Sequence, residues 1–293
     1  MVWTAVFALP LLFASVAALQ TRIDAQTRKQ SQTQEMLLLS SPTVVKKLSL
    51  GYDSLLADVY WTRVVQYYGE RLVKGGADYD LLWPLLDITT TLDPKLVVAY
   101  RFGAIFLSLP HVPPGSNLVG GAGRTDLAVE LVKRGIAANP ENWVLDSDLG
   151  FLYYWQLKDY KNASAAYLDG STKPKAPQWL KMMAARVAAK GGSFENSSLI
   201  WSEVYASTKN PQIQKLAWTM LRALRAQDDE MHLDELATAY RKRIGRYPTS
   251  TAELLNAGYL TKIPVDPAGH PYVFGAEGKS RLAPDSPVVI PPK

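Results

Sequence analysis

Carboxylate-rich and glycine-rich runs are the parts of this chain whose residue types and spacing could do chemistry. Asp228-Asp229-Glu230, followed by Asp234 and Glu235, offers the oxygen ligands of a metal site. Such a run more often complements the positive end of a helix and faces solvent. We therefore expect these residues to begin a helix and to hold no metal.

A glycine-rich stretch at 120–124, Gly-Gly-Ala-Gly-Arg, precedes a predicted helix and could hold an anion with its backbone amides and with Arg124. Phosphate-binding loops of the P-loop type follow a strand and end in Gly-Lys-Ser/Thr, and both features are missing. Phosphate binding is therefore the minor alternative for this stretch.

The remaining residue types exclude most catalytic sites. Cysteine is absent, which excludes disulfides, thiol nucleophiles and thiolate metal sites. The three histidines, His111, His232 and His270, include no pair at ligand spacing. Ser-x-x-Lys, Gly-x-Ser-x-Gly and dinucleotide-binding patterns are also missing. We predict that the protein is not an enzyme and has no catalytic residue, cofactor, metal or small-molecule substrate.

Composition predicts a folded chain with few constraints on its partners. Of the 293 residues, 47% are hydrophobic and 20% are charged, so the bulk of the chain should fold. The net charge of +5 is spread along the chain without a dense Lys/Arg tract. Nucleic acid is therefore not an expected partner.

The first twenty residues predict a membrane anchor. Residues 2–19 are uncharged and almost wholly apolar, and as a helix they would extend roughly 27 Å, close to the thickness of a hydrocarbon core. We expect a transmembrane anchor at 1–20 that contacts the lipid bilayer through residues 2–19. A cleaved signal peptide is the alternative. The small residues around Ala17 favour it, and the lack of a basic residue before the apolar run disfavours it.

The side of the membrane that holds the rest of the chain stays open. Arg22, Arg28 and Lys29 follow the apolar run, which favours a cytoplasmic location for the C-terminal side. A misassigned start codon that removed an upstream basic residue would reverse this inference. Residues 21–49 are interpreted as a polar linker or helix.

Residues 50–76 predict a helix rich in aromatic side chains. At helical spacing Tyr52, Leu55, Leu56 and Val59 share one face, and Trp61, Val65 and Tyr68 form a second. We expect these faces to pack on the helices that follow. The alternative is that the helix lies at the level of the lipid headgroups.

Prolines recur at a repeat spacing from about residue 79 onward. Pro140 and Pro174 are 34 residues apart, as are Pro177 and Pro211, and each suits a boundary between two helices. Between them, small and large residues recur where paired helices would approach closely. We assign to this packing Gly103, Phe106, Ala128 and Pro140; then Gly150, Tyr153, Ala163, Tyr167 and Pro174; and then Ala184, Val187, Leu199, Ala206 and Pro211.

These residues resemble the tetratricopeptide repeat, and the resemblance covers about residues 79–225. It implies a 34-residue helix-turn-helix unit, an α-solenoid and a concave surface that binds other proteins. The sequence departs from the family in three places: the early tryptophan is missing, the spacing from Tyr153 to Ala163 is one residue long, and the first frame is interrupted. A helical bundle without repeats is the alternative. Residues 55–63 are also similar to a segment of bacterial membrane proteins that carry such repeats.

The interruption, residues 110–124, is an insertion where a repeat has a tight turn. We interpret it as a mobile surface loop that contacts a partner, with His111, Asn117 and Arg124 as candidate interaction residues. The alternative is a plug in which Val112, Leu118 and Val119 lie beneath the helices. The first reading predicts that the loop can be shortened without loss of the fold.

The C-terminal segment predicts a long helix from Asp229 to about Ile244, a Gly-Arg-Tyr-Pro turn and a short helix at 251–257. The following Asp-Pro-Ala-Gly-His-Pro-Tyr run, at 266–272, resembles the C-terminal module of type II secretion major pseudopilins. Residues 2–19 lack the glutamate found near the start of a pseudopilin. We therefore interpret the segment as a cap on the repeats and not as part of a filament subunit.

Together these patterns predict an all-α protein with an N-terminal transmembrane helix, a solenoid of tetratricopeptide type at 77–227, a helix-plus-hairpin cap at 228–282 and a proline-rich tail at 283–293. The expected function is a scaffold at the bacterial inner (plasma) membrane, single-pass, that binds other proteins. The alternative is a permanent accessory subunit of a larger membrane complex for secretion, pilus assembly or energy transduction.

Overall fold

A computed structural model describes residues 41–74, 79–113 and 118–290. The described chain is mostly helical with a single two-stranded sheet, so the prediction of an all-α protein is confirmed at this level. The expected membrane segment at 2–19 lies outside the described residues. Among the described helices, none combines the length and the apolar character that crossing a bilayer would need. The chain divides into two compact units that meet at Pro140 and Glu141.

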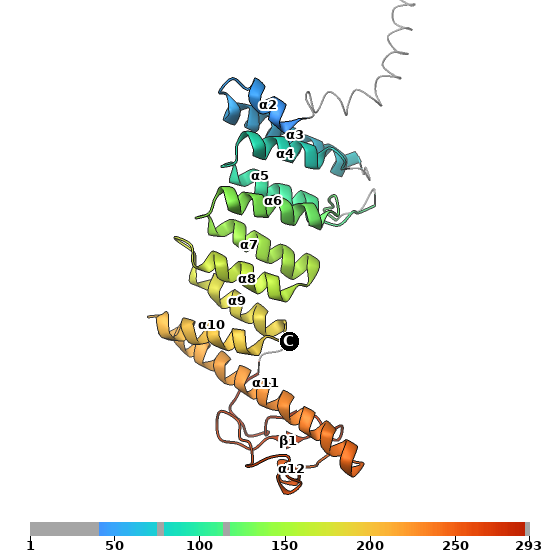
Figure 1. The fold of residues 1–293 in the computed structure, drawn as a ribbon, viewed down its shortest axis with the longest axis vertical. Helices are drawn as coiled ribbons and strands as arrows, with labels where there is room; N and C mark the ends of the chain where they lie inside the picture. Colours follow the sequence, from blue (N-terminus) through green and yellow to red (C-terminus); the bar gives the residue numbers. More distant parts are fainter. Residues whose placement is uncertain (1–40, 75–78, 114–117, 291–293) are drawn as a thin grey trace, which may run out of the picture. The chain divides into compact units, whose positions relative to one another are not determined.

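The first unit contains α2 (Pro42–Leu48), α3 (Asp53–Lys74), α4 (Leu82–Leu92), α5 (Val97–Ser108) and α6 (Thr125–Ala138) (Figure 1). Consecutive helices pack as pairs, α3 with α4 and α5 with α6, and α2 lies against α4. Close approach within the second pair depends on glycine. A Cβ on Gly135 of α6 would come within 2.7 Å of the Tyr100 ring of α5, and one on Gly103 of α5 would come within 2.9 Å of Leu131 of α6.

The second unit begins with α7 (Trp143–Phe151), which continues into the π-helix η1 (Leu152–Leu157). It then contains α8 (Tyr160–Ser171), α9 (Gln178–Lys190), α10 (Phe194–Ser207) and α11 (Pro211–Ile244). Each of these helices packs on the next along the chain. Figure 1 shows α7 to α10 stacked in chain order. Their core includes Tyr167, Leu180 and Trp201, all buried.

The π-helix η1 coincides with the start of the spacing from Tyr153 to Ala163, which is one residue longer than in the tetratricopeptide repeat that the sequence resembles. A π-turn adds one residue to a helix without moving the residues on either side of it. The helix ends at Lys158, whose φ of +55° is a left-handed conformation. The chain then enters α8 with Asp159 as N-cap, which accepts a hydrogen bond of 3.0 Å from the backbone N–H of Asn162. The long spacing thus coincides with a local change in helix type.

The third packing frame predicted from the sequence was wrong by one or two residues. Leu199 and Ala206 are exposed, and the buried side of α10 carries Ser197, Trp201 and Val204. Ser197 donates a hydrogen bond of 2.8 Å from its hydroxyl to the Ala185 carbonyl, so Ala185 and Ser197 form the close contact between α9 and α10. Ser197 and Trp201 are four residues apart, as are Ala163 and Tyr167 of the preceding helix pair. In both pairs a small residue is thus followed by a large ring at the same spacing.

The C-terminal segment also differs from its predicted form. No helix begins at Asp229, because α11 runs without interruption from Pro211 to Ile244. Gly245 ends it in a left-handed conformation with φ of +88°. The short helix α12 (Thr251–Asn256) follows, and then a hairpin of β1 (Val273–Phe274) and β2 (Ser280–Arg281), paired antiparallel with Val273 opposite Arg281.

Candidate functional site

The insertion loop is docked by its backbone where the structure describes it. Residues 121–124 return along the end of α5, and their backbone N–H groups donate to carbonyls of that helix and its cap. The pairs are Gly121 to Pro110 (3.0 Å), Ala122 to Phe106 (3.0 Å), Gly123 to Leu109 (2.8 Å) and Arg124 to Leu107 (2.7 Å). The described half of the loop therefore satisfies the last carbonyls of α5, so our expectation of a mobile loop over 110–124 is wrong for these residues.

Two glycines in this loop serve close approach and not flexibility. A Cβ on Gly121 would lie 2.4 Å from the Phe106 carbonyl oxygen, and one on Gly120 would lie 2.3 Å from a methyl group of Val112. The carbonyl of Gly120 accepts a buried hydrogen bond of 2.6 Å from the Tyr68 hydroxyl of α3. Shortening the loop would remove these bonds and should lower the stability of the first unit; that the fold survives such trimming stays a prediction.

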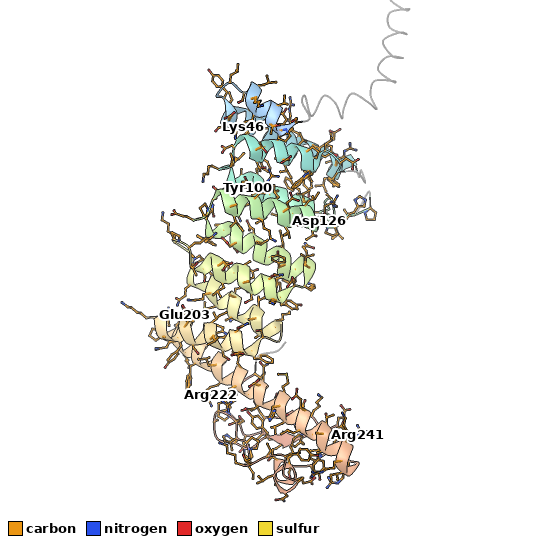
Figure 2. All side chains as sticks on the ribbon, viewed as in Figure 1. Lys46, Tyr100, Asp126, Glu203, Arg222 and Arg241 are labelled. Carbon is orange, nitrogen blue, oxygen red and sulfur yellow. The ribbon has the colours of Figure 1, made fainter. Side chains whose placement is uncertain are left out.

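The anion site considered for 120–124 does not fit this geometry. An anion would need free backbone N–H groups, and those of residues 121–124 are already bonded to α5. The Arg124 guanidinium pairs with both oxygens of Asp126, at 2.9 and 2.7 Å, on the surface at the start of α6 (Figure 2). Phosphate binding at this stretch is therefore not supported.

Two of the three candidate interaction residues of the loop lie within the described part of the chain. His111 is exposed, Arg124 is paired with Asp126, and Asn117 lies outside the described residues. Leu118 and Val119 are exposed as well, so the alternative of a plug beneath the helices is not supported either. Phe106, which precedes the loop, stacks on the Tyr68 ring with centroids 3.9 Å apart.

Apart from the exposed Leu199 and Ala206, residues assigned to repeat packing lie in helix contacts or near the turns between helices. Gly150 of α7 lies against the Tyr167 ring of α8, and Tyr153 packs beside the same core. Ala128, Ala163 and Ala184 are buried. Three prolines are exposed near helix boundaries: Pro140, Pro174 and Pro211, the last of which opens α11.

Helix α3 packs through a face that the sequence reading did not select. Ala57, Tyr60, Val64 and Tyr67 are buried, whereas Tyr52, Leu55 and Val59 are exposed. Of the second predicted face, Tyr68 is buried and Val65 is exposed. The apolar residues of α3 run around most of the helix, so the pattern alone could not show which side meets α4.

Two groups of aromatic rings, one at the starts of α7 and α9 and one on the end of α7, η1 and the start of α8, are a feature of the second unit that sequence reasoning missed. We call them together the aromatic face, which consists of Trp143, Phe151, Tyr154, Trp155, Tyr160 and Trp179. Trp143 and Trp179 meet edge to face at 6.2 Å, and Tyr154 contacts Trp155 at 5.1 Å and Tyr160 at 5.5 Å. Large parts of these rings meet solvent, with Trp155 54% and Trp179 44% exposed.

Lysines border the aromatic face. Lys158 lies over the Trp155 ring at 5.2 Å, and Lys190 lies over the Tyr154 ring at 5.2 Å and the Tyr160 ring at 5.7 Å. Lys190 also donates a hydrogen bond of 3.0 Å to the Tyr154 hydroxyl, and this bond raises the pKa of Lys190. The ammonium group therefore stays charged at neutral pH beside a partly exposed aromatic surface.

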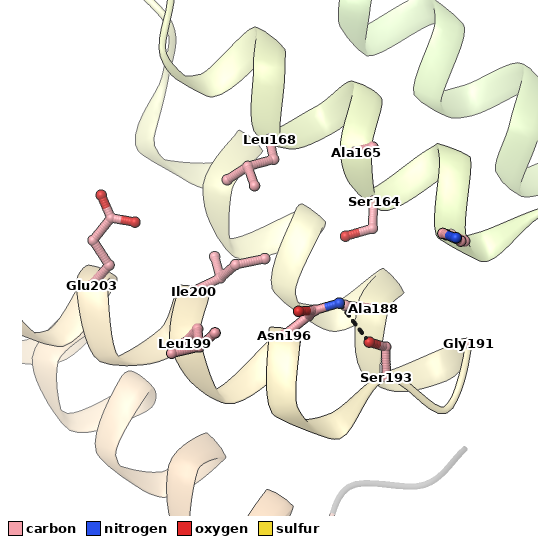
Figure 3. A pocket seen from close by; sticks show the side chains of 11 residues that line it. Ser164, Ala165, Leu168, Ala188, Gly191, Ser193, Asn196, Leu199, Ile200 and Glu203 are labelled. Carbon is pink, nitrogen blue, oxygen red and sulfur yellow. Dashed lines mark hydrogen bonds between the residues drawn. The ribbon is translucent and has the colours of Figure 1, made fainter.

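An open apolar groove of about 560 Å³ lies between α8 and α10 (Figure 3). Ala165 and Leu168 line one side, and Leu199 and Ile200 line the other. Glu203 at one end pairs with Lys181 of α9 at 2.5 Å. The residues that line the groove include no cluster of titratable groups that would suggest catalysis.

The acidic run predicted at a helix start instead holds the C-terminal hairpin. Tyr272 donates to Asp229 at 3.0 Å, and the backbone N–H of Leu282 donates to a Glu230 carboxylate oxygen at 3.1 Å. Asp234 accepts from the backbone N–H of Ser280 at 2.7 Å. Burial and the nearby carboxylate raise the pKa of Tyr272. Within the described residues no group of three or more acidic or histidine side chains could hold a metal ion.

The Asp-Pro-Ala-Gly-His-Pro-Tyr run forms a turn around a buried carboxylate. Asp266 accepts from the backbone N–H groups of Ala268 at 2.7 Å and His270 at 3.0 Å. Although burial opposes it, hydrogen bonds from Ser286 and from these N–H groups hold the pKa of Asp266 below its ordinary value. Gly269 has φ of +95°, which favours glycine at this position. The residues thus have the structural role that the turn pattern predicts.

Glu253 of α12 should make the cap sensitive to acid. Its carboxylate accepts from Thr249 (2.6 Å), Arg246 (2.8 Å) and Tyr240 (3.1 Å). These bonds, those of Thr249 and Arg246 first, lower its pKa to about 2. Because the folded pKa lies below the unfolded value, the stabilisation is complete above about pH 4.5 and is lost as the pH falls toward 2.

The measurement compares the wild type with Glu253→Gln by hydrogen exchange of α12 at each pH. We expect faster exchange in the variant above about pH 5 and equal exchange near pH 2. A difference that does not change across this range would mean that the charge of Glu253 plays no part.

The second unit thus has two exposed surfaces of different character, the aromatic face and the apolar groove. Its C-terminal cap is held by acidic side chains. Comparisons with protein-family models, with curated proteins and with solved structures find no match to this chain.

Proposed function

We propose that this chain is a membrane-tethered helical-repeat scaffold that binds another protein through the aromatic face. The observation that carries the proposal is the exposure of Phe151 and Trp155, on α7 and its continuation η1, and of Trp179 on α9. Large exposed apolar patches mark interaction sites in soluble domains, and tryptophan and tyrosine dominate the energetics of protein interfaces. The 34-residue proline spacing and the paired helices support a solenoid of tetratricopeptide type.

The chemistry of the aromatic face favours a partner with carboxylates beside apolar anchors. Lys158 and Lys190 supply charge at its edge, and α9 carries Lys181, Arg186 and Lys190 without an acidic residue. Positive groups at the rim of an apolar patch steer acidic partners and add little to affinity by themselves. Binding strength would therefore come from the rings, and the choice of partner from the lysines.

The proposal includes no catalysis and no cofactor. A permanent accessory subunit of a larger membrane complex, for secretion, pilus assembly or energy transduction, is the second candidate. The exposed groove between α8 and α10 favours it, because a permanent neighbour would cover more than one surface. An adaptor should purify alone in detergent, whereas an accessory subunit should copurify with its complex at a fixed stoichiometry.

The test is affinity purification of the tagged full chain from native membranes, with copurifying proteins measured by quantitative mass spectrometry. We expect the double variant Trp155→Ala/Trp179→Ala to lose at least about tenfold of the partner, since hot-spot rings contribute about 2 kcal/mol or more each. The matched control is Leu199→Asp, which changes an exposed residue of the groove. Retention of the partner by the tryptophan variant and its loss from Leu199→Asp would assign binding to the groove and overturn the proposal.

A further inference from the structure

An exposed apolar surface covers the first two described helices. We call it the N-terminal face; it consists of Val44, Leu48, Leu50, Tyr52, Leu55 and Val59. Leu50 is 85% exposed, Tyr52 69% and Leu55 64%. We infer that this face lies in the headgroup region of the bilayer, so that the first unit rests on the membrane through α2 and α3.

Helix geometry places the exposed residues of each helix on one side of that helix. Val44 and Leu48 are four residues apart on α2, and Leu55 and Val59 are four apart on α3, so each pair lies on one side of its helix. Leu50 lies in the turn that joins them. The opposite side of α3 packs inside the first unit, because Ala57, Tyr60 and Val64 are buried. The face is therefore the side of α3 that the first unit leaves uncovered.

The turn between α2 and α3 holds an aliphatic side chain outward at a conformational cost. Leu50 has φ of +51°, a left-handed conformation that leucine rarely adopts, and Gly51 follows with φ of +92°. A solvated turn would favour asparagine or glycine at the position of Leu50. An apolar environment around the turn would make the choice of leucine favourable.

The residue types around the face match the boundary between lipid and water. Lys46 and Lys47 are the basic residues of the last turn of α2; Lys46 donates to the Thr91 carbonyl of α4 at 3.0 Å (Figure 2), and Lys47 is exposed. Aliphatic residues, a tyrosine and lysines together are typical of segments that lie in the headgroup layer. Asp53 is held by Ser49 within the turn, and Asp58 is the exposed acidic residue on α3.

The position of the face in the chain is the reason to choose lipid as its occupant. The apolar run at 2–19 ends 22 residues before Pro42, the first residue of α2. Even fully extended, these residues reach at most about 80 Å, so an apolar run held in the bilayer keeps α2 within that distance of it. An apolar run that spans the membrane cannot also cover the N-terminal face. The inference rests on the proposed tether, which the experiment below tests separately.

The absence of cysteine makes a direct measurement possible. The full chain carrying Leu55→Cys, labelled with the environment-sensitive fluorophore NBD, is reconstituted into vesicles of neutral and anionic phospholipid. A spin-labelled lipid with its nitroxide near the headgroup acts as quencher. The matched control is Glu130→Cys, an exposed position on α6, which belongs to the same unit and is separated from α3 by α4 and α5 in packing order. Flotation of the same vesicles reports whether the chain is tethered.

We expect the label at position 55 to be quenched at least about threefold more strongly than the label at 130, with its emission shifted to the blue. Equal, weak quenching at both positions in a chain that floats would overturn the membrane contact and leave the tether standing. A chain that does not float would overturn both. Energy transfer between labels on different copies, with no quenching by lipid at position 55, would assign the face to a second copy and also overturn the inference.

Discussion

Replacing Gly150 by alanine should lower the free energy of unfolding by about 1–3 kcal/mol, whereas the same substitution at Gly69 should raise it by about 0.5–1 kcal/mol. Both glycines lie inside helices, α7 and α3. A Cβ on Gly150 would lie 2.7 to 2.8 Å from three atoms of the Tyr167 ring, whereas a Cβ on Gly69 would meet nothing within 4 Å. One methyl group thus forces two helices apart in the first case and only removes backbone freedom in the second.

The Tyr167 ring has little room to give way. It is buried in the core of the second unit, and burial raises its pKa to about 12. Thermal unfolding followed by circular dichroism, with hydrogen exchange to separate the two units, measures both variants in detergent. If Gly150→Ala melted at the same temperature as the wild type, the contact between α7 and α8 would be looser than these distances state.

Replacing Asp234 by alanine should release the C-terminal hairpin while leaving α11 folded. The Asp234 carboxylate accepts three hydrogen bonds, from the backbone N–H of Ser280 at 2.7 Å, its hydroxyl at 2.9 Å and the Lys279 ammonium at 2.9 Å. Ser280 is buried, so loss of the acceptor leaves a polar group unpaired in the interior. The expected cost is about 1–3 kcal/mol, or roughly 5- to 150-fold faster hydrogen exchange of β2.

The matched control is Asp228→Ala, which removes an exposed carboxylate from the same stretch of α11. Its exchange rates should equal those of the wild type. Asp234→Asn keeps an acceptor oxygen and should recover part of the protection. Equal exchange of β2 in all three variants would mean that the hairpin is held by its own turn and by Tyr272, and that the acidic run serves only solubility.

The fold class could be predicted from the sequence because proline and glycine are local signals. The effect of a proline at a helix boundary depends only on the residues beside it. The glycine opposite Tyr167 depends on a single packing contact. The continuity of α11 could also be predicted from the sequence, since no proline or glycine lies between Pro211 and Ile244. The prediction of a helix start at the acidic run is wrong because the partners of this run, Tyr272 and Ser280, lie 43 and 46 residues away in the sequence.

The surfaces could not be predicted in the same way. Tryptophan and leucine are usually buried, so their type gives no sign that Trp155, Trp179 or Leu55 is exposed. Which side of α3 is buried depends on α4, and a stripe on either side fits a helix equally well. The loop at 110–124 was read as mobile from its glycines, whereas Gly120 and Gly121 are required by contacts with Val112 and Phe106.

The π-helix at Leu152–Leu157 bears on two quantities that are often assumed to change together in repeat proteins, the length of the repeat and the packing of its helices. A repeat period counts residues along the chain, whereas packing depends on where each side chain lies around its helix. One wide turn absorbs a residue and returns the next helix to its place, so the count changes and the packing does not. If the proposed solenoid is right, a turn of this kind would let the length of one repeat differ from the others while its core contacts stay the same.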